Sequence, residues 1–450
     1  MTTSEFDIDA RITVEAMRLG VVPRHTTREY TVGREKLLQE IRADLDLAER
    51  GGALRALIGE YGAGKTHMLT CVQDEALEHG FVTTRVTLNP HDTSPANPQR
   101  VYRALMRSLT LPDREGGPHG LSALIDRALD SPTALERFHV GSIRAATRTS
   151  DYLTHGRHLY LTPALQQLQA LQDAAEDAAG DDVSAEERAR VASARGAVLA
   201  WLSGDHDLPT GDLNTLVQQS ALGRGKLFSL KDYRPWARIY GYLLSGLASL
   251  AQAVGYKGLV VLIDEAEFYA LLDAAHRDFA RTLFKALAYA SLGPRPAEGL
   301  TLPFDPDQEL IDGGAGVLRQ VPGKWAADAP LYTLFVMTPD RAGLQALDGA
   351  IPPSCRSELG LLTPAQFEEL ASRVRAIYGR AYPSQGTNAT VERLIAKLGA
   401  LLMQAGVLTT PRAGMKFLVE LMDISRHRSN KDFVRAIETL RGHLGIGSAG

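Results

Sequence analysis

Residues 59–66 combine three glycines with a lysine and a threonine in a spacing that can hold phosphate. They read Gly-Glu-Tyr-Gly-Ala-Gly-Lys-Thr and fit the pattern G-x-x-x-x-G-K-[ST] at every position. Glycines let the backbone wrap phosphate oxygens with its N–H groups pointing inward, Lys65 supplies a positive charge, and Thr66 offers a hydroxyl to Mg²⁺. We expect the phosphates of a nucleoside triphosphate to contact Gly59, Glu60, Tyr61, Gly62, Ala63, Gly64, Lys65, Thr66 and the next residue, His67.

A pair of adjacent carboxylates, Asp264 and Glu265, follows the apolar run 259–263. Five consecutive apolar residues predict a parallel strand buried on both faces, and ligands bind beyond the carboxyl ends of such strands. Two carboxylates there are costly unless a cation uses them. We expect Asp264 to hold Mg²⁺, directly or through water, and Glu265 to orient and deprotonate the water that attacks the γ-phosphate. A solvated strand end is the structural alternative.

The segments around these motifs alternate between strand and helix patterns. A short apolar run, 53–58, leads into the glycine-rich loop, and a helix pattern follows the loop to about His79. Further strand patterns cover 81–88 and 331–337. This order predicts an α/β fold, a parallel sheet sandwiched by helices. A last short strand is predicted at 359–362.

Two helices are predicted ahead of the glycine-rich loop. Asp9 can cap the first, Gly20 suits its end, and Ile12, Ala16 and Leu19 share one face. The second spans 35–49, with a broad apolar stripe made of Leu37, Leu38, Ile41, Leu45 and Leu47.

A long segment with helix patterns but no convincing strand interrupts the α/β part, and the chain ends in a helical third. The predicted division is an N-terminal helical segment (1–50), the first part of the core (51–111), a helical insertion (112–232), the second part of the core (233–362) and a C-terminal helical lid domain (363–450). The insertion is either a solvated helical pair or a docking site for a partner.

The overall composition is that of a globular protein. The 450 residues are 44% hydrophobic and 23% charged, and the formal net charge of -4 gives no global attraction to nucleic acid. Cys71 and Cys355 lack metal-ligand spacing, which favours a reducing compartment. The N-terminal residues lack a positive signal region, and no apolar stretch approaches the roughly 20 residues of a membrane span. We therefore expect a cytoplasmic protein without membrane contact.

Several blocks together resemble the BREX-system ATP-binding proteins called BrxC and BrxD, the second more closely. The similar blocks are Ala-Arg-Ile at 10–12 through Glu-Ala-Met-Arg-Leu-Gly-Val-Val-Pro at 15–23, Thr-Val-Gly-Arg-Glu at 31–35, the loop at 59–67, the stretch 254–265, and Pro-Arg at 411–412. The segment 112–234 matches nothing that we can name. The resemblance implies an AAA+ P-loop ATPase that uses ATP and Mg²⁺ in a bacterial defence system against phage. Its implied partners are other defence proteins, such as a helicase or a methyltransferase.

The resemblance also implies roles for residues outside the two motifs. Val32, Gly33 and Arg34 would line the adenine pocket through their backbone, or else simply start a helix. Thr338, at the end of a predicted strand, would place its hydroxyl between the acidic pair and the γ-phosphate as sensor 1. Arg412, at a helix start, would fold over the nucleotide as sensor 2. Each has an ordinary structural alternative.

An arginine that reaches the γ-phosphate of a neighbouring subunit is a further implication of the resemblance. Arg356 is the first candidate for this arginine finger, with Arg341 and Arg281 as competitors. Such a residue requires a homo-oligomer, whose interface the sequence does not display.

Two other functions stay open beside an ATPase that remodels partners or DNA. A helicase is one, because Asp-Glu-Ala-Glu at 264–267 looks like a DExx box, although only one P-loop is present and no second α/β pattern follows Met337. A nucleotide-gated scaffold that hydrolyses slowly is the other. DNA contact is a hypothesis that rests on the Gly- and Pro-rich insert 293–330 and on Arg426, His427, Arg428, Lys431, Arg435 and Arg441. Solvated surface is its alternative.

Overall fold

The computed structural model divides the chain into two compact units. The first unit comprises residues 1–41, 58–72 and 358–450, and the second comprises 42–57 and 73–357. The structure describes residues 7–23, 26–114, 118–141, 149–177, 184–205, 209–221, 226–231, 236–294, 296, 300–310, 320–383, 389–427 and 430–443.

A five-stranded sheet forms the centre of the α/β part, and its strand order is β2-β3-β4-β1-β5. The strands are β1 (Ala53–Ile58), β2 (Val82–Thr87), β3 (Leu259–Asp264), β4 (Leu331–Met337) and β5 (Arg356–Glu358). β2 pairs with β3 and β3 with β4 in parallel. Every residue of β3 and β4 is buried, as continuous apolar runs require when both faces of a strand are covered. The expected strands at 53–58, 81–88, 259–263 and 331–337 are confirmed.

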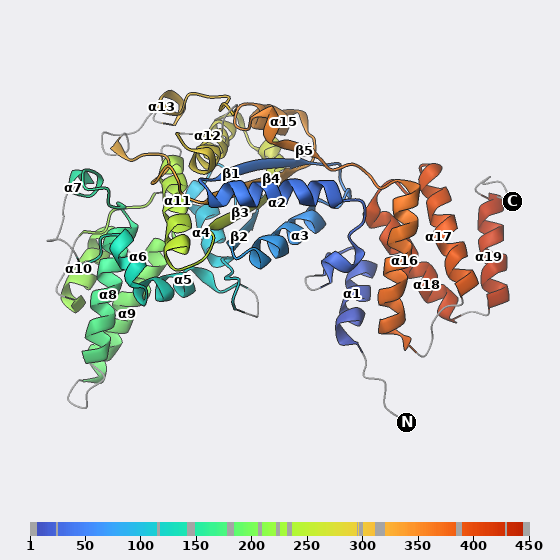
Figure 1. Ribbon diagram of the computed structural model, residues 1–450, viewed down its shortest axis with the longest axis horizontal. Helices are drawn as coiled ribbons and strands as arrows, with labels where there is room; N and C mark the ends of the chain where they lie inside the picture. Colours follow the sequence, from blue (N-terminus) through green and yellow to red (C-terminus); the bar gives the residue numbers. More distant parts are fainter. Residues whose placement is uncertain are drawn as a thin grey trace. The chain divides into compact units, whose positions relative to one another are not determined.

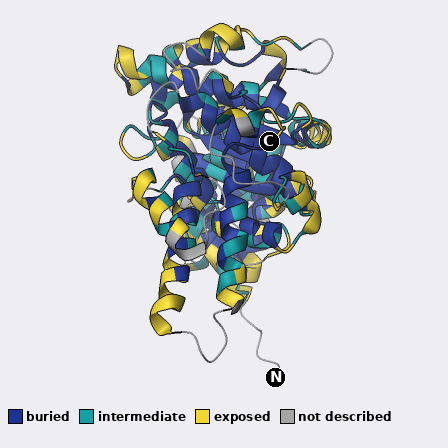
Figure 2. Cartoon of the chain, turned by 90° about the vertical axis from the view of Figure 1, so that its left-hand side faces the viewer, coloured by how far each residue is buried: buried dark blue, intermediate teal, exposed yellow. Residues whose placement is uncertain are grey.

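Long helices cover the sheet. α11 (Ala237–Ala253) contacts β3 and β4, α12 (Ala274–Leu292) contacts β4, and α4 (Pro98–Arg107) contacts β2. α11 and α12 pack closely because Gly241 has no side chain, and a Cβ there would lie 2.9 Å from the carbonyl oxygen of Ala286. Figure 2 shows the buried residues surrounded by exposed residues on loops and outer helices.

A buried ion pair joins β1 to its surroundings in the second unit. Arg55 of β1 donates from Nη2 to Oδ1 of Asp44 over 2.8 Å, and Tyr332 of β4 donates its hydroxyl to Oδ2 of the same carboxylate over 2.9 Å. Arg55 also donates to Oγ of Ser357 in β5, over 2.6 Å. Asp44 lies on α2 (Glu35–Glu49), so these bonds connect one helix with three strands.

In the segment expected to be a helical insertion, the regular elements that the structure describes are all helices, joined by turns and irregular stretches (Figure 1). Its helices are α5 (Gly120–Leu129), α6 (Pro132–Arg137), α7 (Thr149–Leu153), α8 (Leu161–Asp177), α9 (Ala185–Leu202) and α10 (Thr210–Ala221). α8 packs on α9, and α10 packs on both. Nδ1 of the buried His158 accepts hydrogen bonds from the backbone N–H groups of Tyr160 and Leu161 at the start of α8. The imidazole therefore caps this helix.

Short helices follow β3 and β4. They are the 3₁₀ helix η3 (Ala266–Leu271), α13 (Pro306–Glu309), α15 (Arg341–Asp348) and the 3₁₀ helix η4 (Pro353–Cys355). The expected insert 293–330 is described only in part, with α13 in its middle.

The first unit contains the C-terminal helices and the first helix of the chain. Its elements include α1 (Ile8–Leu19), η1 (Thr27–Tyr30), α16 (Pro364–Ala381), α17 (Ala389–Gln404), α18 (Pro411–His427) and α19 (Asn430–His443). α3 (Lys65–Glu78) begins in this unit. Phe367 fills the centre of the helical core, where Gly399 and Gly414 leave room for its ring. A capping box of Thr363 and Gln366 starts α16.

Three details of the predicted elements are wrong. Ile12 and Leu19 of α1 are 58% and 73% exposed, and the buried face consists instead of Ala10, Thr13, Val14 and Met17. The N-cap of α1 is Asp7 rather than Asp9, because the Asp7 carboxylate accepts from the N–H of Ala10. In α2, Leu47 is 47% exposed whereas Asp44 is buried.

The last strand also lies elsewhere than expected. β5 covers Arg356–Glu358 and ends before the predicted range 359–362. Leu359 still donates its N–H to the carbonyl oxygen of Ile58 over 2.7 Å, so the chain stays paired for one residue beyond the strand.

Candidate functional site

The glycine-rich loop turns between β1 and α3 in the way its sequence predicts. Gly62 and Gly64 have φ angles of 80° and 97°, a left-handed conformation that favours glycine. Nζ of Lys65 donates to the carbonyl oxygens of Gly59 over 3.0 Å and Glu60 over 3.2 Å. The lysine is 7% exposed, so its charge is held against the loop. These contacts curl the loop around the lysine.

The three glycines of the loop differ in how closely other atoms approach them. A Cβ on Gly59 would lie 2.9 Å from Cβ of Leu359, and one on Gly62 would lie 2.8 Å from the side chain of Thr410. A Cβ on Gly64 would meet nothing within 4 Å. α3 begins at the next residue, so this uncrowded glycine directly precedes a helix N-terminus, which carries roughly half a positive charge. The loop therefore combines an uncrowded glycine with a lysine and the start of a helix.

The predicted adenine segment lies against the same loop in the first unit. Arg34 donates from Nη2 to the carbonyl oxygens of Ala63 over 3.3 Å and Gly360 over 2.8 Å. Gly33 has a φ of 67°, and a Cβ there would lie 2.3 Å from Nε2 of Gln366. Val32 is buried, and burial lowers the pKa of the Arg34 guanidinium. Arg34 thus connects this segment to the glycine-rich loop at 59–66, which we call the phosphate loop below after the ligand that its sequence predicts. The contact of the 32–34 backbone with adenine stays a prediction.

His67, on the first turn of α3, is part of a buried cluster. Its Nε2 lies 2.8 Å from Oγ1 of Thr31, and its ring lies 4.8 Å from the ring of Tyr30. Thr31 also lies 3.3 Å from the sulfur of Cys71. Burial, and then the nearby Arg34, lower the pKa of His67 to about 4. A neutral imidazole in this place packs α3 against the 30–34 segment.

Arg412 contacts the phosphate loop directly. Its Nη1 donates to the hydroxyl of Tyr61 over 3.0 Å, and its guanidinium lies 5.3 Å from the centre of the Tyr61 ring. Thr410, just before α18, approaches Gly62. The predicted sensor 2 residue and the loop therefore belong to one unit and touch, although the role itself stays a prediction.

The acidic pair lies in the second unit, at the end of β3. Asp264 is 2% exposed, and its Oδ2 accepts from Nη2 of Arg85 over 2.7 Å. Its Oδ1 accepts from the N–H of Glu265 over 3.1 Å. Arg85 lies on β2, where it is the partner of Leu262 in the sheet register. The buried carboxylate is thus neutralised by an arginine from the adjacent strand.

Glu265 and Glu267 occupy the turn that follows. Glu265 adopts φ 60° and ψ 40°, a left-handed conformation that costs about 1–3 kcal/mol for a residue with a side chain and clusters at functional sites. Oε1 of Glu267 accepts from the hydroxyl of Thr338, while its Oε2 is buried and has no hydrogen-bond partner among the described residues. Thr338 therefore contacts the acidic turn through Glu267. Its predicted contact with the γ-phosphate stays a prediction.

The three arginine finger candidates differ in their surroundings. Arg356 forms an ion pair with Asp348 and donates to the carbonyl oxygens of Leu347 and Ile351, with 18% of its side chain exposed. To reach another subunit it would have to break these contacts. Arg341 and Arg281 are exposed and form no hydrogen bond or ion pair within the part of the chain that the structure describes.

The basic residues named for DNA contact are only partly described. Arg426 stacks over Tyr382, with its guanidinium 4.2 Å from the ring centre, and lies 3.1 Å from Nε2 of His427. Arg428 and the side chain of Arg441 lie outside the described residues. Lys431 and Arg435 are on α19. The hypothesis gains no support from these positions.

The described residues contain neither a cluster of metal-ligating side chains nor a helix that could span a membrane. No group of three or more His, Cys, Asp or Glu side chains is placed to hold a metal ion by itself. Among the helices that are described, none is both long and apolar enough to cross a membrane.

Comparison with known proteins gives the family. Residues 8–322, more than half of the chain, match the family model described as BREX system ATP-binding protein BrxC/D. The chain belongs to this family. Curated proteins and solved structures gave no match. The match covers the phosphate loop and the acidic pair, whereas Thr338, Arg356 and Arg412 lie beyond it.

Two contacts of the site were not expected from the sequence. The ion pair of Arg85 with Asp264 joins residues 179 positions apart, and only the strand register brings them together. The contact of Glu267 with Thr338 likewise depends on the neighbouring β3 and β4. The alternation along β2 places Arg85 on a definite face, but this does not identify which neighbouring strand it meets.

Proposed function

We propose that this BrxC/D family protein binds ATP with Mg²⁺ and hydrolyses it to ADP and phosphate. The observation that carries the proposal is the conformation of the 59–66 loop. Gly62 and Gly64 are left-handed, Lys65 closes the loop, and the side of Gly64 is open at the start of α3. A glycine-rich turn without a ligand would need neither the buried lysine nor the open face.

In this proposal each part of the loop has a separate task. Backbone N–H groups of 62–66 bind the β- and γ-phosphates, and Lys65 exchanges its two carbonyl partners for phosphate oxygens. Val32, Gly33 and Arg34 contribute to the adenine pocket, beside His67. Arg412 donates to the triphosphate from the start of α18.

Hydrolysis is assigned to the acidic turn after β3. Glu265 orients the attacking water and accepts its proton, and the strained backbone fixes the direction of its side chain. Thr338, held by Glu267, orients the water or the γ-phosphate from β4. The proposal requires β3 and the phosphate loop, which follows β1 of the same sheet, to serve one nucleotide.

In this proposal Thr66 and Asp264 each supply an oxygen ligand to a magnesium ion. Thr66 offers a hydroxyl that forms no hydrogen bond with another described residue, and Asp264 offers a carboxylate at a strand end. Mg²⁺ bound there would neutralise charge that develops on the phosphate oxygens. Asp264 is already paired with Arg85, so the metal must share or replace that partner.

At the level of the cell, we propose an AAA+ ATPase of a BREX-type defence system against phage, closer to BrxD than to BrxC. Hydrolysis would drive assembly or DNA remodelling together with other components of the system, such as a helicase or a methyltransferase. A homo-oligomer would supply the arginine finger, for which the exposed Arg341 and Arg281 are better placed than Arg356. Mass measurement with and without a non-hydrolysable ATP analogue tests the oligomer.

A slow nucleotide-gated switch is the second candidate function, and the ion pair on Asp264 favours it because a metal ligand held by arginine would slow turnover. Turnover stimulated by DNA or a partner would support the motor, and a flat low rate in every mixture would support the switch. An autonomous helicase is disfavoured because the described residues form a single sheet, with only helices after β5.

Two substitutions test the two halves of the proposal. Lys65→Ala should abolish ATP binding, whereas Glu265→Gln should keep binding and trap ATP without hydrolysing it. Lys257→Ala is a matched control, because this exposed lysine pairs with Glu49 and should leave both unchanged. Calorimetric titration with ATP and a phosphate-release assay give the readouts. Retained turnover in Glu265→Gln would assign water activation to another group.

A further inference from the structure

Tyr61 combines a position inside the phosphate loop with an exposed ring. The ring is 71% exposed, so it contributes little to any core. Its side chain contacts Arg412, which donates to the hydroxyl over 3.0 Å and has its guanidinium 5.3 Å from the ring centre. Hydrogen bond and cation–π contact therefore hold one guanidinium at the edge of the loop.

The first turn of α18 is fixed at the same place by other contacts. Thr410 caps the helix, accepting from the N–H of Ala413 over 3.2 Å, and its side chain fills the space where a Cβ of Gly62 would lie. The methylene groups of Arg412 lie close to Gly20, 3.4 Å from the position of a Cβ there. The stem of Arg412 is thus packed, while its guanidinium rests on Tyr61.

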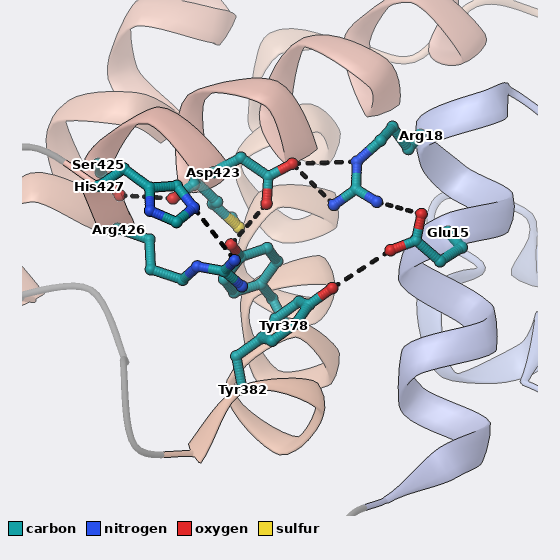
Figure 3. Close-up of polar contacts among 9 residues, drawn as sticks. Glu15, Arg18, Tyr378, Tyr382, Asp423, Ser425, Arg426 and His427 are labelled. Atoms are coloured by element: carbon teal, nitrogen blue, oxygen red, sulfur yellow. Dashed lines mark hydrogen bonds and ion pairs between the residues drawn. The ribbon is translucent and has the colours of Figure 1, made fainter.

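The other end of α18 is bound to α1 (Figure 3). Oδ2 of Asp423 accepts from Nε of Arg18 over 3.0 Å and from Nη2 over 2.7 Å, and Oδ1 accepts from the hydroxyl of Tyr378 over 2.7 Å. Tyr382 donates to Glu15 of α1 over 3.3 Å. α18 is therefore anchored at both ends, and at the phosphate loop its partners are Tyr61 and Gly62.

We propose that Tyr61 is a positioning residue that holds Arg412 ready for the γ-phosphate, so that the C-terminal helices respond to a triphosphate and not to a diphosphate. The inference rests on the proposed function and deepens it. Arg412 uses one donor on a neutral hydroxyl, which leaves its other donors for an anion. A side chain that is ordered before binding loses less conformational entropy when the ligand binds. This raises the affinity only for a nucleotide that Arg412 contacts.

A double-mutant cycle tests the coupling of Tyr61 with Arg412. Affinities for a non-hydrolysable ATP analogue and for ADP are measured by calorimetry in wild type, Tyr61→Ala, Arg412→Ala and the double variant. We expect each single change to lower the affinity for the analogue about 5- to 10-fold and the affinity for ADP less than about 2-fold. The double variant should bind the analogue with about the same affinity as the single variant that binds it less tightly. Tyr61→Phe keeps the ring but loses the hydroxyl, so its affinity for the analogue should fall about 2- to 3-fold.

Two controls separate positioning from general damage. Arg426→Ala removes another arginine stacked on a tyrosine from the same helix, and it should leave both affinities unchanged. Thermal unfolding of Tyr61→Ala should stay within about 1 °C of wild type, because the ring is exposed.

The outcomes that overturn the inference differ from those that overturn the proposed function. Additive losses in the double variant, or equal losses for the analogue and ADP, would show that Tyr61 does not act through Arg412. Failure of the wild type to bind either nucleotide would overturn the proposed function, and this inference with it.

Discussion

Replacing Arg85 by methionine perturbs the acidic end of β3 without touching a proposed ligand. Arg85 donates to Oδ2 of Asp264 over 2.7 Å, and the two side chains are 22% and 3% exposed. Methionine keeps much of the apolar stem of arginine and removes the charge. The variant therefore leaves a buried carboxylate without its counter-ion.

The expected cost follows from the burial of the pair. Two unit charges about 4 Å apart attract by about 4 kcal/mol at an effective dielectric constant of 20, and removing one partner of a buried pair typically costs 3–5 kcal/mol. The partial exposure of Arg85 admits some water, so we expect roughly 3 kcal/mol of lost stability. The second unit has about 300 residues, so at roughly 2 cal/mol/K of unfolding entropy per residue its unfolding temperature should fall by roughly 5 °C.

Magnesium and nucleotide should restore part of this loss if Asp264 binds the metal. In the wild type the metal competes with Arg85 for the carboxylate, whereas in Arg85→Met it meets an unpaired one. A ligand that binds only the folded state stabilises it by RT ln(1 + [L]/Kd), and a lower Kd gives a larger gain. We expect saturating Mg²⁺ with a non-hydrolysable ATP analogue to recover at least half of the loss.

Differential scanning fluorimetry with four conditions (no ligand, Mg²⁺, analogue with EDTA, analogue with Mg²⁺) provides the measurement. The control is Arg55→Met, which breaks the ion pair of similar burial with Asp44 on α2. It should lose stability as well but gain no more from Mg²⁺ and analogue than wild type gains. If Arg85→Met and wild type gain equally, Asp264 does not hold the metal and our assignment of it is wrong.

Further predictions concern the phosphate loop and a buried histidine. Gly64→Ala should cost about 1 kcal/mol of stability and at least tenfold in ATP affinity, whereas Gly156→Ala, with a φ of 68° and equally open surroundings, should cost similar stability and no affinity. Circular dichroism and calorimetry check both. Burial lowers the pKa of His158 to about 3, below its ordinary 6.5, so the unfolded state binds more protons between these values and stability falls as the pH drops. Wild type should lose about 2 kcal/mol more than His158→Asn between pH 7.5 and 5 in urea unfolding.

Much of the α/β core could be predicted because its signals are local. The run 331–337 is apolar without interruption, and β4 covers the same residues. The run 259–263 likewise gives β3, apart from its last residue. The phosphate loop combines a fixed motif with glycines at the positions that become left-handed, Gly62 and Gly64. In each case the determinant lies within a few residues.

What could not be predicted depends on partners distant in sequence. Ile12 and Leu19 have the spacing of a buried helix face, but α1 buries Ala10, Val14 and Met17 instead, in the core that it shares with α16 and α18. A helix with two apolar faces has no local signal for the buried one. The ion pair of Arg85 with Asp264 could not be predicted for the same reason, because it depends on the pairing of β2 with β3.

The charged groups of the two predicted motifs have different kinds of partner, and we expect this difference to set the order in which they engage a ligand. Lys65 rests on two backbone carbonyls and Arg412 on a tyrosine hydroxyl, all neutral acceptors. A triphosphate can take over these cations without separating any ion pair, and it gains charge-assisted hydrogen bonds. Asp264 instead forms an ion pair with Arg85. A metal ion that binds this carboxylate therefore gains only the difference between its own interaction energy and that of the arginine. The phosphate contacts should therefore supply most of the binding free energy, and the engagement of Asp264 should be the later and more finely balanced step.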